Sequence, residues 1–87
     1  MKVTELCDAI DAQIEVLYHP NQNFRWSAKF KGGEIIQDGC LISSFGNGKT
    51  PQEAVENYAA KIRGKRICFG AFTANRREFV MPKELEL

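Results

Sequence analysis

The sequence is poor in the residue types that usually carry cross-links, metals or catalysis. It has three cysteines, Cys7, Cys40 and Cys68, and a single histidine, His19. The cysteines are odd in number and far apart, unlike the dense, even framework of a small secreted domain. We expect free thiols that pack as small hydrophobes. No spacing among these residues matches a zinc motif, so we expect no metal and no other cofactor.

Long apolar runs are also missing. A membrane-spanning helix needs about 20 apolar residues, and no segment here approaches that length. Acidic residues follow Lys2, so the start has no apolar stretch of the kind that forms a signal peptide. We expect a cytoplasmic protein without membrane contact, with one domain over residues 1–82 and a frayed tail at 83–87.

Catalytic groupings are absent as well. An enzyme needs a nucleophile with a base and an orienting group, or two carboxylates that face one another across a cleft. His19 precedes Pro20 in a predicted turn, and the acidic residues fall mostly on helix faces and helix starts. The sequence therefore predicts a protein that is not an enzyme.

The strongest local signal is a helix at about 51–63. Thr50 is a good N-cap, Pro51 suits the first helical position, and Glu53 stands where it can complete a capping box. Apolar residues then recur at helical spacing as far as Ile62, and Gly64 is a natural end. A shorter amphipathic pattern predicts another helix at about 4–12.

Between these helices the hydrophobic period is two residues, which is typical of strands. It predicts strands at 14–18 and 24–30, a tight turn at Gly32-Gly33, and a third strand within 34–45 that Asp38-Gly39 bulges or breaks. Extended segments at 65–72 and 78–81 follow the second helix. We therefore predict an α+β two-layer sandwich, in which two helices cover an antiparallel three-stranded meander (αβββα) with a C-terminal β extension.

Basic residues provide the candidate interaction surface. The segment from Asn57 to Arg77 has six bases and no acid. Such asymmetry indicates either a surface for an acidic partner or solvated helix and strand ends. The candidate surface residues are Arg25, Lys29, Lys31, Lys61, Arg63, Lys65, Arg66, Arg76 and Arg77.

Two other patterns allow a functional and a structural interpretation. The glycine-rich run Gly46-Asn47-Gly48-Lys49-Thr50 could cradle a phosphate, but its glycines lack P-loop spacing, which favours a plain loop with a helix cap. Phe24, Trp26 and Phe30 alternate with basic residues and could form a stacking platform for nucleic acid. Strict alternation places aromatics and bases on opposite faces, which favours an aromatic core.

The predicted αβββα order, with its glycine-rich loop before the second helix, resembles the double-stranded RNA-binding domain. That family grips phosphates with lysines at the helix start, where this chain has only Lys49, so the resemblance implies topology rather than RNA binding. Gly39-Cys40 and the later run 48–55 are similar to the HicB-type antitoxin fold. The run from Phe45 through 63–65 to 75–82 resembles small orphan proteins of bacteriophages and mobile elements.

These observations predict a small non-enzymatic binding or adaptor protein of phage or mobile-element type that acts through a protein partner. The open sheet face, or a strand edge in the C-terminal hairpin, would make the contact. The alternative is a nucleic-acid-binding protein that uses the basic residues. The sequence leaves the partner and the oligomeric state open.

Overall fold

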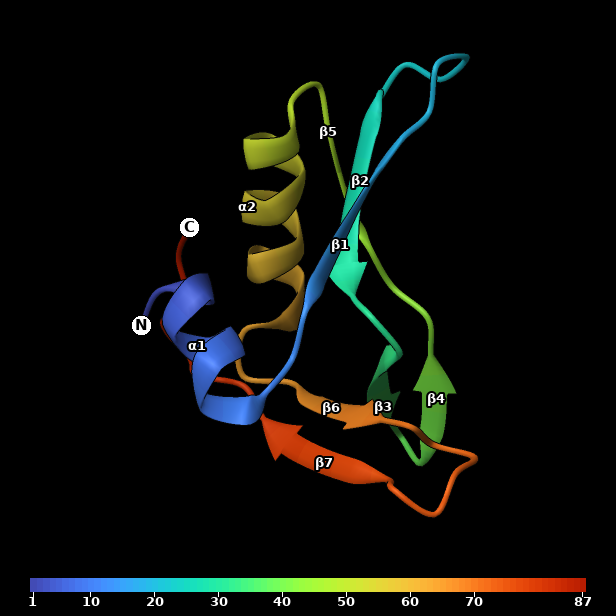
Figure 1. Cartoon of the computed structure of the whole chain (residues 1–87), viewed down its shortest axis with the longest axis vertical. Coiled ribbons are helices and arrows are strands. Elements are labelled where there is room, and N and C mark those ends of the chain that lie inside the picture. Colours follow the sequence, from blue (N-terminus) through green and yellow to red (C-terminus); the bar gives the residue numbers. More distant parts are fainter.

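The computed structural model describes the whole chain, residues 1–87. Its two helices, α1 (Val3–Ile10) and α2 (Pro51–Ile62), lie on the same side of the molecule (Figure 1). The predicted second helix and the N-cap at Thr50 are confirmed, because the Thr50 hydroxyl accepts a hydrogen bond of 3.1 Å from the Glu53 amide. The return bond from the Thr50 amide to the Glu53 side chain, which would complete the capping box, is absent. Neither helix has the length and apolar character that crossing a membrane requires.

The strands form two antiparallel sheets. The first sheet, in the order β1-β2-β5, consists of β1 (Ile14–Tyr18), β2 (Trp26–Phe30) and β5 (Gly46–Gly48). The second, in the order β4-β3-β6-β7, consists of β4 (Cys40–Ile42), β3 (Gly33–Gln37), β6 (Arg66–Phe69) and β7 (Arg77–Val80). Helix α2 packs on the first sheet, and the second sheet lies beyond its C-terminal end (Figure 1).

The predicted single meander under two helices is wrong, and with it the αβββα order that the RNA-binding-domain resemblance implied. Residues 34–45 form a hairpin of two strands instead of one. Its turn residues, Asp38 and Gly39, both have positive φ angles, 52° and 77°, which is the type I′ geometry that Asp-Gly favours. Strand β3 pairs with β4 and β6 but not with β2, so the chain changes sheets at Gly32-Gly33 instead of turning back.

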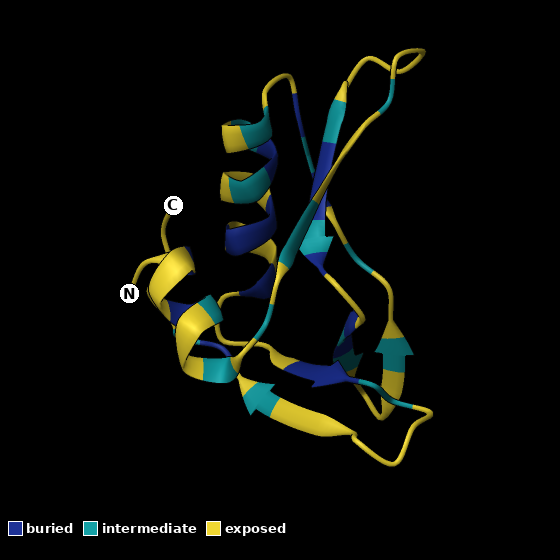
Figure 2. Ribbon diagram, in the orientation of Figure 1, coloured by how far each residue is buried: buried dark blue, intermediate teal, exposed yellow.

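One buried aromatic residue joins the two sheets and α2. Phe30, at the end of β2, is 0% exposed. Its ring meets Tyr58 of α2 at 5.7 Å and Phe69 of β6 at 5.4 Å, both edge to face, the arrangement that aromatic pairs prefer. The most deeply buried ribbon segments in Figure 2 lie around this junction, on α2, β2 and β6.

The glycine-rich run predicted as a loop is partly strand β5, against which α2 packs directly. A Cβ atom on Gly46 would collide with the Ala54 carbonyl oxygen and the Tyr58 amide nitrogen. One on Gly48 would lie 2.5 Å from the Ala54 nitrogen. These glycines are therefore explained by close backbone packing rather than by a phosphate site.

The tail at 83–87, which we expected to fray, is packed. Leu85 is 1% exposed, and Glu86 forms a parallel bridge with Lys2. The Val3 amide donates to the Glu86 carbonyl oxygen at 2.7 Å. The two ends of the chain thus stabilise one another.

Replacing Thr50 with alanine should lower the free energy of unfolding by about 1 kcal/mol, because the Glu53 amide loses its side-chain acceptor. The measurement is a urea titration. Lys49→Ala is the matched control, since the adjacent Lys49 is exposed and makes no side-chain hydrogen bond. Equal midpoints for the two variants would show that the cap contributes no stability.

Candidate functional site

The nine candidate basic residues lie in several separate places of the structure, and several of them make contacts that stabilise the fold. Lys61 Nζ donates to the Phe45 carbonyl oxygen at 2.8 Å. Arg63 Nε donates to that of Leu85 at 2.9 Å. Lys61 lies in the last turn of α2 and Arg63 directly follows the helix, and both side chains hold other segments beside α2.

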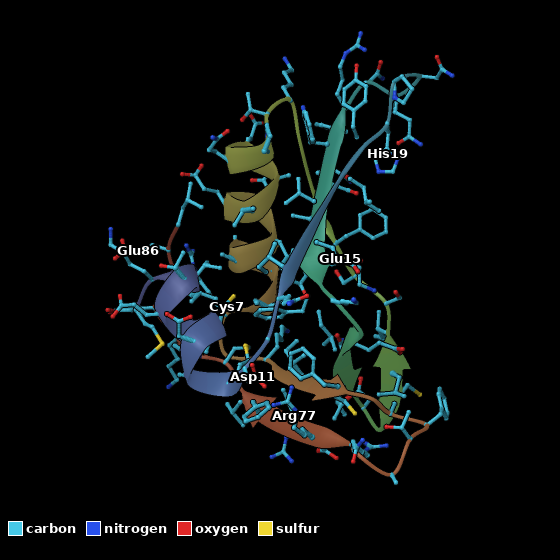
Figure 3. The ribbon with its side chains drawn as sticks, viewed as in Figure 1. Cys7, Asp11, Glu15, His19, Arg77 and Glu86 are labelled. Atoms are coloured by element: carbon cyan, nitrogen blue, oxygen red, sulfur yellow. The ribbon has the colours of Figure 1, made fainter.

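Arg77 has the most extensive set of contacts among the bases. Its guanidinium donates to the Ile10 carbonyl oxygen at 2.7 Å and to that of Asp11 at 3.2 Å. It also lies 5.5 Å from the ring centres of both Phe69 and Phe79, within the range of a cation–π contact. In Figure 3 its side chain points from β7 towards the end of α1 at Asp11. Arg77 thus attaches α1 to the second sheet.

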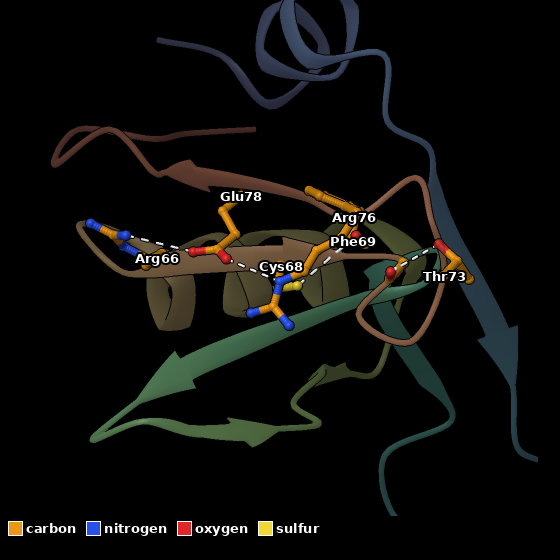
Figure 4. A network of polar contacts seen from close by, with 7 residues as sticks. Arg66, Cys68, Phe69, Thr73, Arg76 and Glu78 are labelled. Carbon is orange, nitrogen blue, oxygen red and sulfur yellow. Dashed lines mark hydrogen bonds and ion pairs between the residues drawn. The ribbon is translucent and has the colours of Figure 1, made fainter.

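Two further bases share an acid that follows the base-rich segment directly. Glu78 pairs with Arg66 at 3.6 Å and with Arg76 at 3.0 Å. Figure 4 shows these three side chains beside Cys68, whose thiol is 0% exposed. The ionic group therefore covers a buried thiol on the outer face of the second sheet.

The remaining bases lie elsewhere. Arg25 donates to the Tyr18 hydroxyl and the Pro20 carbonyl oxygen, each at 3.2 Å, and Lys29 reaches the Ser43 hydroxyl at 3.4 Å. Lys31 and Lys65 are exposed and make no side-chain hydrogen bond or ion pair. The nine bases therefore lie in several separate places, and most of them contact groups of this chain.

The predicted aromatic core is only partly correct. Phe30 is buried, whereas Phe24 is 49% exposed in the turn before β2. Trp26 is half-buried at the margin of the core, where its ring lies 5.0 Å from that of Tyr18. Phe30, Trp26 and Phe24 thus run in this order from the core out to the free end of the first sheet.

His19 and Ser27 form the only side-chain pair that resembles part of a catalytic set. The histidine Nε2 and the serine hydroxyl lie 2.8 Å apart. A nucleophile and base also need a group that orients the base, and no carboxylate bonds to His19. The pair is explained as a hydrogen bond that satisfies buried Ser27 beside the β1–β2 turn.

Strand β1 has a free edge. It pairs only with β2. Two hydrogen bonds flank this pair of strands: the His19 amide donates to the Arg25 carbonyl oxygen, and the Lys31 amide donates to that of Gln13. They determine which residues of β1 exchange hydrogen bonds with β2. Odd-numbered residues of β1 therefore bond to β2, and the N–H and C=O groups of Ile14, Val16 and Tyr18 point away from it.

The side chains of these three residues lie on the face of the sheet that α2 covers, because their cross-strand partners are Phe30, Ala28 and Trp26. Helix α2 packs mainly on β5 and β2, so this cover is incomplete over β1. Val16 remains 36% exposed and Tyr18 50% exposed.

An apolar groove of about 320 Å³ continues this exposed strip. It runs between α1, β1 and α2. Its lining residues are Val3, Thr4, Cys7, Asp8, Ile14, Val55 and Leu87. Ile14 belongs to both the groove and the free edge, so the two form one continuous feature.

The other outer strands of the two sheets are less open to pairing. Strands β4 and β5 have only three residues each, and β7 carries the charged residues Arg77 and Glu78. Strand β1 has five residues, with Glu15 as its single charge and no proline. Proteins protect sheet edges with short strands, charges and proline, and β1 has the least of this protection.

Sequence reasoning did not identify β1 as a site. The predicted meander already places 14–18 at an edge, but the incomplete cover of this strand by α2 and the groove beside it are tertiary features that no local pattern specifies. The sequence instead predicts a contact on the open sheet face or on the C-terminal hairpin, whose edge strand is β7.

The three thiols should react at different rates, which gives a probe of the groove. Cys40 is exposed, Cys7 is partly buried and Cys68 is buried. Burial raises the pKa of the Cys7 thiol, and the charge of Asp8 raises it further. We expect alkylation by N-ethylmaleimide, followed by mass spectrometry at neutral pH, to modify Cys40 first, Cys7 later and Cys68 only on unfolding. Equal rates at Cys7 and Cys40 would contradict the placement of Cys7.

A scan against protein-family models and searches of curated proteins and of solved structures found no match for this chain. Within the structure, no three His, Cys, Asp or Glu side chains lie together as a metal-binding group. The geometry of β1 and the groove therefore carries the functional proposal.

Proposed function

We propose that this protein is a small non-enzymatic binding module that docks on a protein partner by strand addition to β1. One observation carries the proposal: the unpaired backbone edge of Ile14, Val16 and Tyr18 adjoins an apolar groove. In strand addition, main-chain hydrogen bonds supply affinity, and pockets for alternate side chains supply specificity. The free edge and the groove provide these two elements.

The expected energetics suit a reversible contact. Each new backbone hydrogen bond contributes about 0.5–1.5 kcal/mol net. Burial of apolar surface contributes about 25 cal/mol per Å², and Val16, Tyr18 and the groove offer such surface. The partner segment should be extended, with apolar residues at every second position, because alternate side chains of an added strand face the groove.

An adaptor of phage or mobile-element type, as the sequence resemblance implies, would act in this way. Nucleic-acid binding through the basic residues has less support. Seven of the nine make hydrogen bonds or ion pairs within the chain, and phosphate binding requires bases that are free to reach a common surface.

The test is selection of a displayed library of random dodecapeptides on the dilute protein. We expect the selected peptides to alternate apolar and polar residues and to bind with little dependence on salt. Val16→Lys should abolish this binding. Leu17→Lys is the matched control, since it adds the same charge to the same strand on the opposite face. Absence of such peptides, or equal binding by the two variants, would contradict the proposal.

A parallel titration with duplex and single-stranded DNA and RNA distinguishes the alternative. Binding through phosphate weakens steeply as salt rises. Two results together would favour the nucleic-acid function instead: no peptide is selected, and the protein binds nucleic acid in a salt-sensitive way that Lys31→Ser and Lys65→Ser reduce.

A further inference from the structure

We infer that the strand added to β1 is β1 of a second copy of this chain, paired antiparallel about Val16. This inference rests on the proposed function, because it names the partner for the same edge. The product is a two-fold symmetric dimer in which two three-stranded sheets become one continuous sheet.

The alternation of inward and outward hydrogen-bonding groups along β1 makes its free edge complementary to the same edge of a second copy. The groups that point outward belong to alternate residues and are symmetric about Val16. In an antiparallel pair centred there, Val16 faces Val16 of the second copy, and Ile14 faces Tyr18. Residues that exchange both bonds recur at every second position, so each outward N–H group meets a C=O group. A register shifted by one residue would leave them unmatched.

The side chains fit the same register. Tyr18 of each copy lies opposite Ile14 of the other, and Ile14 lines the apolar groove. The half-exposed Tyr18 ring can therefore enter the groove of the second copy, beside Cys7 and Val55. Asp8 and Thr4, which line the same groove, provide acceptors for the tyrosine hydroxyl, and a buried tyrosine needs such a partner.

The charges are complementary as well. Antiparallel pairing brings the β1–β2 turn of each copy to α1 of the other. The turn carries the cation Arg25, whose guanidinium already lies at the Tyr18 hydroxyl, whereas α1 carries the exposed acids Glu5 and Asp8. Glu15, the single charge on β1, faces Leu17 of the second copy and meets no like charge. Opposite charges across an interface favour association and fix its register.

Analytical ultracentrifugation of the full chain, from dilute to concentrated protein, tests the inference. We expect a reversible monomer–dimer equilibrium. Val16→Lys should raise its dissociation constant at least about tenfold, the equivalent of about 1.4 kcal/mol, because it places two like charges at the two-fold axis. Leu17→Lys should not weaken the dimer, since that residue faces Glu15 of the second copy.

A backbone variant and a groove probe complete the test. Val16→Pro removes an amide that points away from β2, so the β1–β2 ladder keeps its bonds while the dimer loses two. Circular dichroism verifies that this variant folds, and if it does not, Tyr18→Ala replaces it. In wild-type protein, alkylation of Cys7 by N-ethylmaleimide should slow with rising protein concentration, while that of Cys40 should not.

The outcomes separate the two proposals. A monomer at every concentration that still binds selected peptides through Val16 would overturn the dimer and leave the proposed function intact. A dimer that forms equally well with Val16→Lys would overturn this inference, because its interface would lie elsewhere. The absence of both self-association and peptide binding would overturn both proposals.

Discussion

Gly46→Ala should destabilise the protein by about 3 kcal/mol or more, at the upper end of the cost of overpacking a core. The added methyl group would occupy the space of the Ala54 carbonyl oxygen and the Tyr58 amide nitrogen, and it would lie 2.7 Å from the Tyr58 Cα. All three are backbone atoms of α2, which cannot rotate aside as a side chain can. The helix must therefore move off β5, and with it the buried ring of Tyr58.

Chemical denaturation measures this effect, with Asn47→Ala as the control. Asn47 lies between the two close-packed glycines and is half-buried on the other face of β5. Its backbone carbonyl, which accepts from Asn57, remains in the alanine variant. We expect the control to lose less than about 1 kcal/mol, as most surface changes do. A Gly46→Ala variant as stable as this control would contradict the direct packing of α2 on β5.

Arg77→Ala should lower the free energy of unfolding by about 2 kcal/mol, since hydrogen bonds to a charged group contribute about 1.5–3 kcal/mol. The change removes both bonds to the end of α1 and the cation–π contacts with Phe69 and Phe79. An eight-residue helix depends on such tertiary contacts. Amide exchange within α1 should therefore accelerate more than exchange within α2.

Arg76→Ala is the matched control, because Arg76 is adjacent in sequence and makes an exposed ion pair with Glu78. Pairs of this kind contribute about 0–1 kcal/mol. Similar losses for the two variants, or α1 exchange that Arg77→Ala leaves unchanged, would show that Arg77 does not anchor the helix.

Local signals in the sequence predicted the elements that local physics determines. The cap at Thr50, the helix that follows and the C-terminal hairpin all agree with the structure. The hairpin turn at Asp38-Gly39 could also have been predicted, since Asp-Gly between apolar runs is a strong hairpin signal. The prediction of one strand with a bulge or a break at Asp38-Gly39 merged β3 and β4, and the predicted sheet was therefore wrong.

The division into two sheets could not be predicted in this way. It depends on Phe30, Tyr58 and Phe69, which meet from distant parts of the chain, and no local pattern specifies such a junction. The packing role of Gly46 and Gly48 could not be predicted from the sequence for the same reason. A glycine-rich run indicates a loop until the position of the helix against it is known.

The candidate site shows a similar limit. The basic residues were visible as a cluster in sequence, but the carbonyl groups that Lys61, Arg63 and Arg77 contact lie in distant segments. The predicted meander leaves 14–18 with one neighbour, but the groove beside that edge is lined by α1, α2 and Leu87, which come from distant parts of the chain. The hydrophobic alternation of 14–18 indicated a strand but not which side of it lacks a neighbour.

Amide hydrogen exchange within β1, followed by NMR, tests the central claim that this edge is the docking site. In dilute protein, the Glu15 and Leu17 amides should be protected by β2, whereas the Val16 and Tyr18 amides should exchange quickly. Concentrated protein, or a bound peptide from the selected set, should protect Val16 and Tyr18. Rapid exchange at these two residues under every condition, or full protection already in the dilute monomer, would contradict the account.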